Sequence, residues 1–361
     1  MRYLLALALA LTALPALARP VPASPSPTPC TSATAACEQW VSLGGRARSM
    51  VYATYPLDRR NTQVRRALIM VHGTLRNADH YFVTATGAAF LAQAQGDTLV
   101  IAPAFHSAGK GCDDRLAPGE VSWSCGGDSW RSGGAALSDP VLTSFDLMDS
   151  ILTGLADKTT FPNLRAIVVA GHSAGGQFVS RYEMANRVHE NLRVPVTYVV
   201  ANPSSYAWPD ATRVRPEGDA APAAAAQAWK EEEPHTNFTF GAFDAAKVPE
   251  YDKWPYGLEG RTGGYTARMG DEQLRRQLAA RPTTYLFGQV DVLPLGGFDA
   301  SPQAMAQGPT RRARGEAFVK YLKDHLGGDP KVLIVPECGH NDRCVYTTDA
   351  VLKVIFPTVT P

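Results

Sequence analysis

Residues 168–179, VVAGHSAGGQFV, place Ser173 inside the pattern Gly-x-Ser-x-Gly at residues 171–175. The apolar run 164–171 before it predicts a buried strand, and apolar residues at helical spacing over 177–190 predict a helix after it. Strand, sharp turn and helix are the setting in which this pattern holds a hydroxyl clear of a sheet. Side chains at Gly171 and Gly175 would collide with neighbouring elements, so the pattern indicates a nucleophilic serine.

The rest of the chain predicts an α/β fold built on a mostly parallel sheet. Apolar runs rich in Val and Ile predict strands at 66–73, 97–103, 196–202, 283–288 and 331–337, and helical spacing predicts helices at 145–158 and 314–326. Strands that are apolar throughout are typical of a sheet with helices on both faces. The interval of about 203–282 lacks a clear strand and is rich in Pro, Ala and aromatic residues. We interpret it as an insertion that forms a cap or lid.

The N-terminus has the layout of a secretory signal peptide. Arg2 precedes an apolar run from Tyr3 to Leu11, and small residues at 16–18 offer a cleavage site. We therefore expect a signal peptide at 1–18, a Pro/Ser-rich linker at 19–36 and the folded domain at 37–361. The run is too short to span a bilayer, and no later segment is long and apolar enough. A secreted or periplasmic protein is predicted.

The six cysteines form three neighbouring pairs along the chain, and the predicted export bears on whether they form disulfides. An oxidising compartment favours disulfides, and this spacing favours Cys30–Cys37, Cys112–Cys125 and Cys338–Cys344. The formal charge is +1, with 35 basic and 34 acidic residues interspersed, so neither a nucleic acid nor an acidic membrane is expected as a partner. We expect a monomer.

Over roughly residues 64–356 the sequence resembles the α/β-hydrolase superfamily, in the order of its elements as well as in the 171–175 turn. In that family the nucleophile, the acid and the base follow successive strands in this order. The resemblance implies Ser173 as nucleophile, Asp291 after 283–288 as acid and His340 after 331–337 as base. Asp299 and Asp210 remain alternative acids. The mechanism that this resemblance implies needs no cofactor.

The family also implies two backbone donors for the oxyanion that forms during acyl transfer. One is the N–H of Ala174, directly after the serine. The other lies in the loop after the strand 66–73, where Thr74 is predicted and Leu75 remains open. His72, Gly73 and His172 are interpreted as residues that support this turn and this loop.

The stretch ECGHNDRC, residues 337–344, raises a metal site as an alternative for His340. Zinc would need Cys338, His340, Cys344 and a fourth ligand, but structural zinc sites usually carry paired C-x-x-C spacings, which this chain lacks. We predict no metal. Our hypothesis is instead that a Cys338–Cys344 disulfide limits the movement of the base.

Five aromatic residues are candidates for lining a substrate cleft, namely Trp123, Trp130, Tyr206, Trp208 and Trp254. The motif HSAGGQ, together with export, is also similar to secreted esterases of the polyester-depolymerase and feruloyl-esterase kind. The sequence therefore predicts a secreted serine hydrolase that cleaves a small-molecule or polymeric carboxylic ester through an acyl-enzyme. Amide, lactone or acyl-transfer chemistry at the same site, and a non-catalytic binding protein on the same fold, are the alternatives.

Overall fold

The computed structural model describes residues 27–125, 129–215, 237–261 and 264–359. The predicted signal peptide and the first part of the predicted linker lie outside these residues. Within them, no helix is long and apolar enough to cross a membrane.

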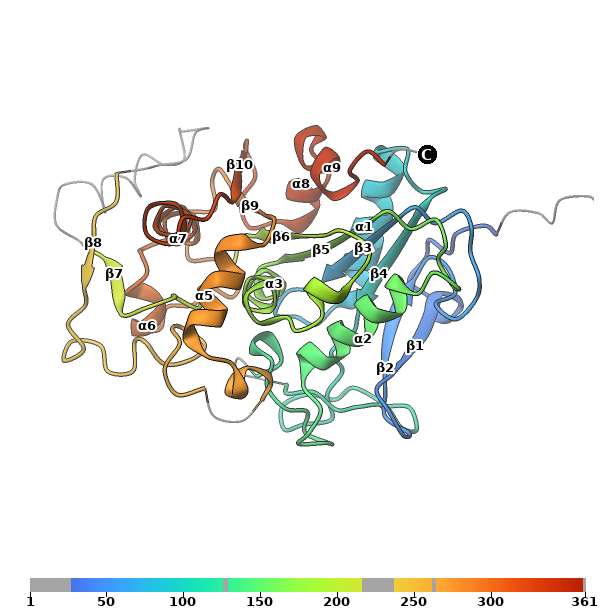
Figure 1. The fold of residues 1–361 in the computed structure, drawn as a ribbon, viewed down its shortest axis with the longest axis horizontal. Helices are drawn as coiled ribbons and strands as arrows, with labels where there is room; N and C mark the ends of the chain where they lie inside the picture. Colours follow the sequence, from blue (N-terminus) through green and yellow to red (C-terminus); the bar gives the residue numbers. More distant parts are fainter. Residues whose placement is uncertain (1–26, 126–128, 216–236, 262–263, 360–361) are drawn as a thin grey trace, which may run out of the picture.

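An eight-stranded sheet with the order β1-β2-β4-β3-β5-β6-β9-β10 forms the centre of the molecule (Figure 1). The strands from β4 to β10 in this order are all parallel, and β2 pairs antiparallel with both β1 and β4. This confirms the predicted α/β fold with a mostly parallel sheet. The strands are β1 (Glu38–Ser42), β2 (Arg48–Ala53), β3 (Arg66–Val71), β4 (Thr98–Pro103), β5 (Ala166–His172), β6 (Val196–Ala201), β9 (Thr283–Gly288) and β10 (Lys331–Val335).

Helices cover both faces of this sheet, as the continuous apolar strands require. Along β3, Leu68 and Met70 pack into one core cluster, and Ile69 and Val71 pack into the other. The first cluster includes side chains of α1 and α9, and the second includes side chains of α2, α3, α5 and α7. The helices are α1 (Ala78–Leu91), α2 (Ser144–Ala156), α3 (Ala174–Ala185), α5 (Asp271–Ala280), α6 (Pro302–Met305), α7 (Arg311–Leu326), α8 (Asp342–Tyr346) and α9 (Asp349–Ile355).

The segment 203–282 leaves the sheet after β6 and returns to it at β9, the neighbouring strand. Its described part contains a small two-stranded sheet, β7 (Thr212–Val214) with β8 (Phe240–Ala242), and the helix α5, which packs on α3 and α7. A buried ion pair fixes it, because the guanidinium of Arg213 donates to Asp252 over 2.9 Å. Figure 1 shows α5 beside α3 and α7, with β7 and β8 on the side of α7 that is away from α3.

The described end of the predicted linker is attached to the domain. The backbone N–H of Cys30 donates to the carbonyl of Thr54 over 2.8 Å, and Cys30 is disulfide-bonded to Cys37, which is fully buried. The chain therefore joins the folded body about seven residues before the predicted domain boundary. The predicted disulfides Cys112–Cys125 and Cys338–Cys344 are also present.

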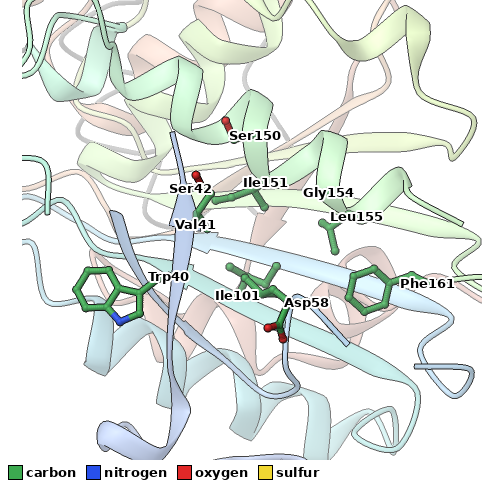
Figure 2. Close-up of a pocket in the computed structure, with 11 residues that line it drawn as sticks. Trp40, Val41, Ser42, Asp58, Ile101, Ser150, Ile151, Gly154, Leu155 and Phe161 are labelled. Carbon is green, nitrogen blue, oxygen red and sulfur yellow. The ribbon is translucent and has the colours of Figure 1, made fainter. Parts of the chain in front are cut away.

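A small apolar cavity of about 210 Å³ lies between β1, β4 and α2 (Figure 2). Val41, Ile101, Ile151 and Phe161 contribute to its walls, and Asp58 lies at its edge. It shares no lining residue with the hollow at Ser173 described below.

Candidate active site

Ser173 occupies the turn between β5 and α3 in a strained backbone conformation, with φ 59° and ψ −120°. Such a conformation costs a non-glycine residue about 1–3 kcal/mol and persists only where the surroundings enforce it. The flanking glycines allow it. A Cβ on Gly171 would lie 2.2 Å from the carbonyl oxygen of Gly175, and a Cβ on Gly175 would lie 2.2 Å from that of Val71. The turn therefore presses α3 against β3 and β5 and presents the hydroxyl at the carboxyl end of the sheet.

The loop after β10 brings His340 to this hydroxyl. His340 Nε2 lies 2.9 Å from Ser173 Oγ, and His340 Nδ1 lies 2.8 Å from Asp291 Oδ2. A carboxylate can only accept, so Nδ1 carries the proton and Nε2 is free to accept from the serine hydroxyl. The structure therefore joins Ser173, His340 and Asp291 in one series of hydrogen bonds.

Asp291 follows β9 and is buried, with its other oxygen held by Arg311. The Arg311 guanidinium donates to Asp291 Oδ1 over 3.2 Å, to Ser204 Oγ over 2.8 Å and to the carbonyl of Gly296 over 2.9 Å. Both members of the pair are almost fully shielded, with side-chain exposures of 0% and 2%. Arg311 thus fixes Asp291 in place and compensates its buried charge.

The two alternative acids are engaged elsewhere. Asp210 accepts from the Tyr321 hydroxyl and the Thr212 backbone, and Asp299 accepts from Tyr256 and Ser301. Neither contacts the imidazole of His340.

The predicted oxyanion donors lie on both sides of Ser173. Gly73 lies against the serine, since a Cβ there would be 3.6 Å from Ser173 Cβ. Among the residues that the structure describes, the backbone N–H groups of Thr74, Leu75 and Ala174 have no hydrogen-bond partner. Ala174 is also the first residue of α3, where the helix dipole favours negative charge. These groups could receive a developing oxyanion.

His72 and His172 support the site as buried neutral side chains. His72 Nδ1 donates to the carbonyl of Gly73 over 2.9 Å, and its Nε2 accepts from the N–H of Phe105 over 3.3 Å. Burial lowers the pKa of His72 to about 4 and holds the pKa of His172 well below its usual value. His72 thereby ties the Thr74 loop to the end of β4.

Three supporting residues were not anticipated from the sequence. The Tyr81 hydroxyl lies 3.0 Å from His172 Nδ1. The Asn202 amide donates to the carbonyl of Gly339 and accepts from the N–H of Gly288 over 2.8 Å, which joins the ends of β6 and β9 to the His340 loop. Arg311 is the third. Asn202 could have been recognised as a candidate site residue from the sequence, because it is a polar residue directly after an apolar strand.

A hollow of about 350 Å³ opens in front of Ser173. It is lined by Gly73, Thr74, Leu75, Asn77, His80, Tyr81, His172, Ser173, Gly296, Gly297, His340 and Asp342. In the described part of segment 203–282, no residue contributes to this lining.

The predicted aromatic cleft is wrong. Trp123, Trp130, Tyr206 and Trp208 are each at most 2% exposed and belong to the hydrophobic core. Trp254 packs against that core and donates from Nε1 to the Ser132 carbonyl over 3.1 Å. Trp130 stacks on Phe105 and Tyr206 stacks on Phe318, because burying their large apolar area is favourable.

The zinc alternative does not fit the structure, because Cys338 and Cys344 are bonded to each other and are therefore unavailable as thiolate ligands. Over the described ranges of the chain, no group of three or more His, Cys, Asp or Glu side chains is arranged to hold a metal ion.

Comparison with known proteins adds a family and two structural neighbours. Residues 68–353 match the model of the Alpha/beta hydrolase family. The chain is similar in structure to LpqC, a poly(3-hydroxybutyrate) depolymerase from Bordetella parapertussis, with 18% identity and a TM-score of 0.58 over 90% of each chain. It is also similar to poly(aspartic acid) hydrolase-1 from Sphingomonas sp. KT-1, with 20% identity and a TM-score of 0.59 over 88% of this chain and 97% of that one. No curated protein matches it in sequence.

Proposed function

We propose, since the chain belongs to the alpha/beta hydrolase family, that it is a serine hydrolase which cleaves carboxylic esters through an acyl-enzyme. One observation carries this proposal, namely the continuous hydrogen-bond series from Ser173 Oγ through both ring nitrogens of His340 to Asp291. That series supplies a nucleophile, a base and a group that orients the base.

In the proposed mechanism, the base accepts the serine proton as Ser173 Oγ attacks the ester carbonyl. His340 Nε2 is already at hydrogen-bond distance from this hydroxyl, so no rearrangement is needed. Asp291 keeps the proton on Nδ1 and stabilises the imidazolium that forms. The negative charge on the carbonyl oxygen is met by the N–H of Ala174 and by that of Thr74 or Leu75. His340 then protonates the leaving alcohol. In the second half of the reaction, His340 accepts a proton from water, the water attacks the acyl carbonyl, and His340 returns the proton to Ser173 Oγ as the acid is released.

Esters are the preferred substrate class because their alkoxide leaves more easily than an amine. The two structural neighbours are named for a polyester and for a poly(amino acid), so a polymeric ester is a candidate substrate alongside small esters. Amides, lactones and acyl transfer remain the second candidate. Hydrolysis rates for p-nitrophenyl butanoate and for the corresponding anilide distinguish ester from amide preference.

Labelling with a fluorophosphonate probe tests the nucleophile. Wild-type protein is expected to be labelled and the Ser173→Ala variant is not. Ser150→Ala is a matched control, because Ser150 lies on α2 and donates only to the carbonyl of Asp146. Labelling that persists in Ser173→Ala would contradict the assignment, and unlabelled wild type would favour a non-catalytic binding protein.

We further propose that the protein is exported. The charge and apolar pattern of residues 1–18 support this, as do the three disulfides, which form in oxidising compartments. Protein recovered from a secreting host is expected to lack residues 1–18, which its measured mass would show. Full-length protein retained in a reducing cytoplasm would contradict export.

A further inference from the structure

A second histidine–aspartate pair lies in the wall of the hollow, apart from His340 and Asp291. His80, on α1, and Asp342, at the start of α8, both line the hollow at Ser173. His80 Nε2 lies 3.0 Å from each carboxylate oxygen of Asp342. Thr84 Oγ1 donates to Asp342 Oδ2 over 2.8 Å. The carboxylate is thus held by a second donor and fixes the orientation of the imidazole.

These contacts determine where the neutral His80 ring carries its proton. A carboxylate accepts only, so Nε2 is the protonated nitrogen and Nδ1 keeps its lone pair. Among the residues described, no group donates to Nδ1. The His80 side chain is 32% exposed, whereas that of Asp342 is only 12% exposed. The pair therefore presents a fixed acceptor that has no partner within the protein.

The remaining lining explains which substrates would use this acceptor. Thr74 and Asn77 are polar, and Gly296 and Gly297 contribute no side chain to the lining. Leu75 is the single aliphatic side chain among the lining residues, and it is 80% exposed. A plain alkyl chain in this hollow would displace water from Nδ1 without replacing the hydrogen bond.

We propose that His80 is a specificity-determining residue whose Nδ1 accepts a hydrogen bond from a hydroxyl group on the substrate, close to the scissile ester. This inference rests on the proposed ester hydrolysis at Ser173. Because the site is partly open to water, one such bond corresponds to about a tenfold preference in kcat/KM. Hydroxylated esters are the substrate class that follows.

Two matched substrate pairs test this assignment, one for each half of the ester. On the acyl side, p-nitrophenyl 3-hydroxybutanoate is compared with p-nitrophenyl butanoate. On the alcohol side, 2-hydroxyethyl butanoate is compared with ethyl butanoate by titration of the released acid. Wild-type protein is expected to prefer the hydroxylated member of at least one pair about tenfold in kcat/KM. Equal rates within both pairs would overturn the inference and leave the proposed function standing, whereas no hydrolysis of any of the four esters would contradict the proposed function itself.

Substitutions of His80 separate recognition from a merely structural role. In His80→Gln, the side-chain amide nitrogen can replace Nε2 as donor to Asp342, but nothing replaces Nδ1. The preference ratio is therefore expected to fall from about ten to about one. In His80→Asn, the amide oxygen can take the place of Nδ1, so part of the preference should return. His325→Gln is the matched control, since His325 is exposed near the end of α7 and stacks on Tyr321. A ratio that stays at ten in His80→Gln would overturn the assignment to Nδ1.

Discussion

The contribution of Glu183 to the stability of this protein should fall as the pH rises, because this side chain is buried without a full ionic partner. Glu183 lies in the last turn of α3 and is fully buried, and its carboxyl group contacts the hydroxyls of Thr283 and Tyr285 at 2.8 and 2.7 Å. Burial raises its pKa from 4.5 to about 8, although the two hydroxyls and the nearby Arg281 oppose this shift. The folded protein therefore keeps Glu183 protonated at neutral pH, and the unfolded chain does not.

The sign and size of the effect follow from this difference in pKa. A carboxyl group whose pKa is higher in the folded state contributes stability below about pH 4.5, and this contribution is lost as the pH rises through about 8. At about 1.4 kcal/mol per pKa unit, the complete loss is roughly 5 kcal/mol. About 4 kcal/mol of it falls between pH 5 and pH 9.

The Glu183→Gln variant isolates this contribution, because glutamine resembles the protonated acid. Thr283 can donate to the Arg281 carbonyl, 3.2 Å away, and accept from the new amide. We expect the Tm of Glu183→Gln, measured by circular dichroism relative to wild type, to rise by about 8 °C between pH 5 and pH 9, at roughly 2 °C per kcal/mol. Glu272→Gln, on the exposed face of α5, should show no such trend. A Tm difference for Glu183→Gln that is constant or that shrinks with pH would refute the reasoning.

Three further predictions concern the site. Asp291→Asn should lower kcat by about 10⁴-fold, because an amide at this position favours the wrong tautomer of His340; a loss below tenfold, from p-nitrophenyl butanoate kinetics, would argue against Asp291 as the acid. The same substitution should also lower the Tm, because it leaves the buried guanidinium of Arg311 without its anionic partner. Gly171→Ala places a Cβ 2.2 Å from a carbonyl oxygen and should cost about 1–3 kcal/mol in denaturant unfolding, and an unchanged midpoint would contradict the packing argument. Replacing Cys338 and Cys344 by serine should lower the free energy of unfolding by about 2 kcal/mol. It should also lower turnover after mild heating, before global unfolding begins. Turnover that simply follows unfolding would exclude a local role of this disulfide in limiting the movement of His340.

The central strands were predictable because each is buried on both faces, which leaves a continuous apolar run in the sequence. The strand β5 is an example, since six of its seven residues are buried. The edge strand β1 gave no comparable run, because most of its residues are only partly buried. The helix α1 was also missed. This helix packs against both the sheet and helix α8, so no single apolar stripe distinguishes one of its faces.

The aromatic residues show where sequence reasoning ends. A tryptophan has the same composition signal whether it lines a cleft or fills the core, and only tertiary packing decides between them. For the arginines at the start of α7, by contrast, the sequence could have predicted acidic partners. Arg311 and Arg312 occupy the first turn, where the helix dipole disfavours positive charge. Such a placement indicates that the cations have acidic partners, which are Asp291 and Glu316 here.

The loop of His340 is positioned from both of its ends, which explains why a short surface loop can hold this imidazole so close to Ser173. On one side, the carbonyl of Cys338 accepts from the N–H of Val290, next to Asp291, over 3.0 Å. On the other side, Asp342 is bound by side chains of α1. The Cys338–Cys344 disulfide closes a ring that contains both of these contacts and His340 between them. Moving His340 away from Ser173 would therefore require breaking bonds to two different parts of the fold, and buried charge at Asp291 and Asp342 makes each of these breaks costly.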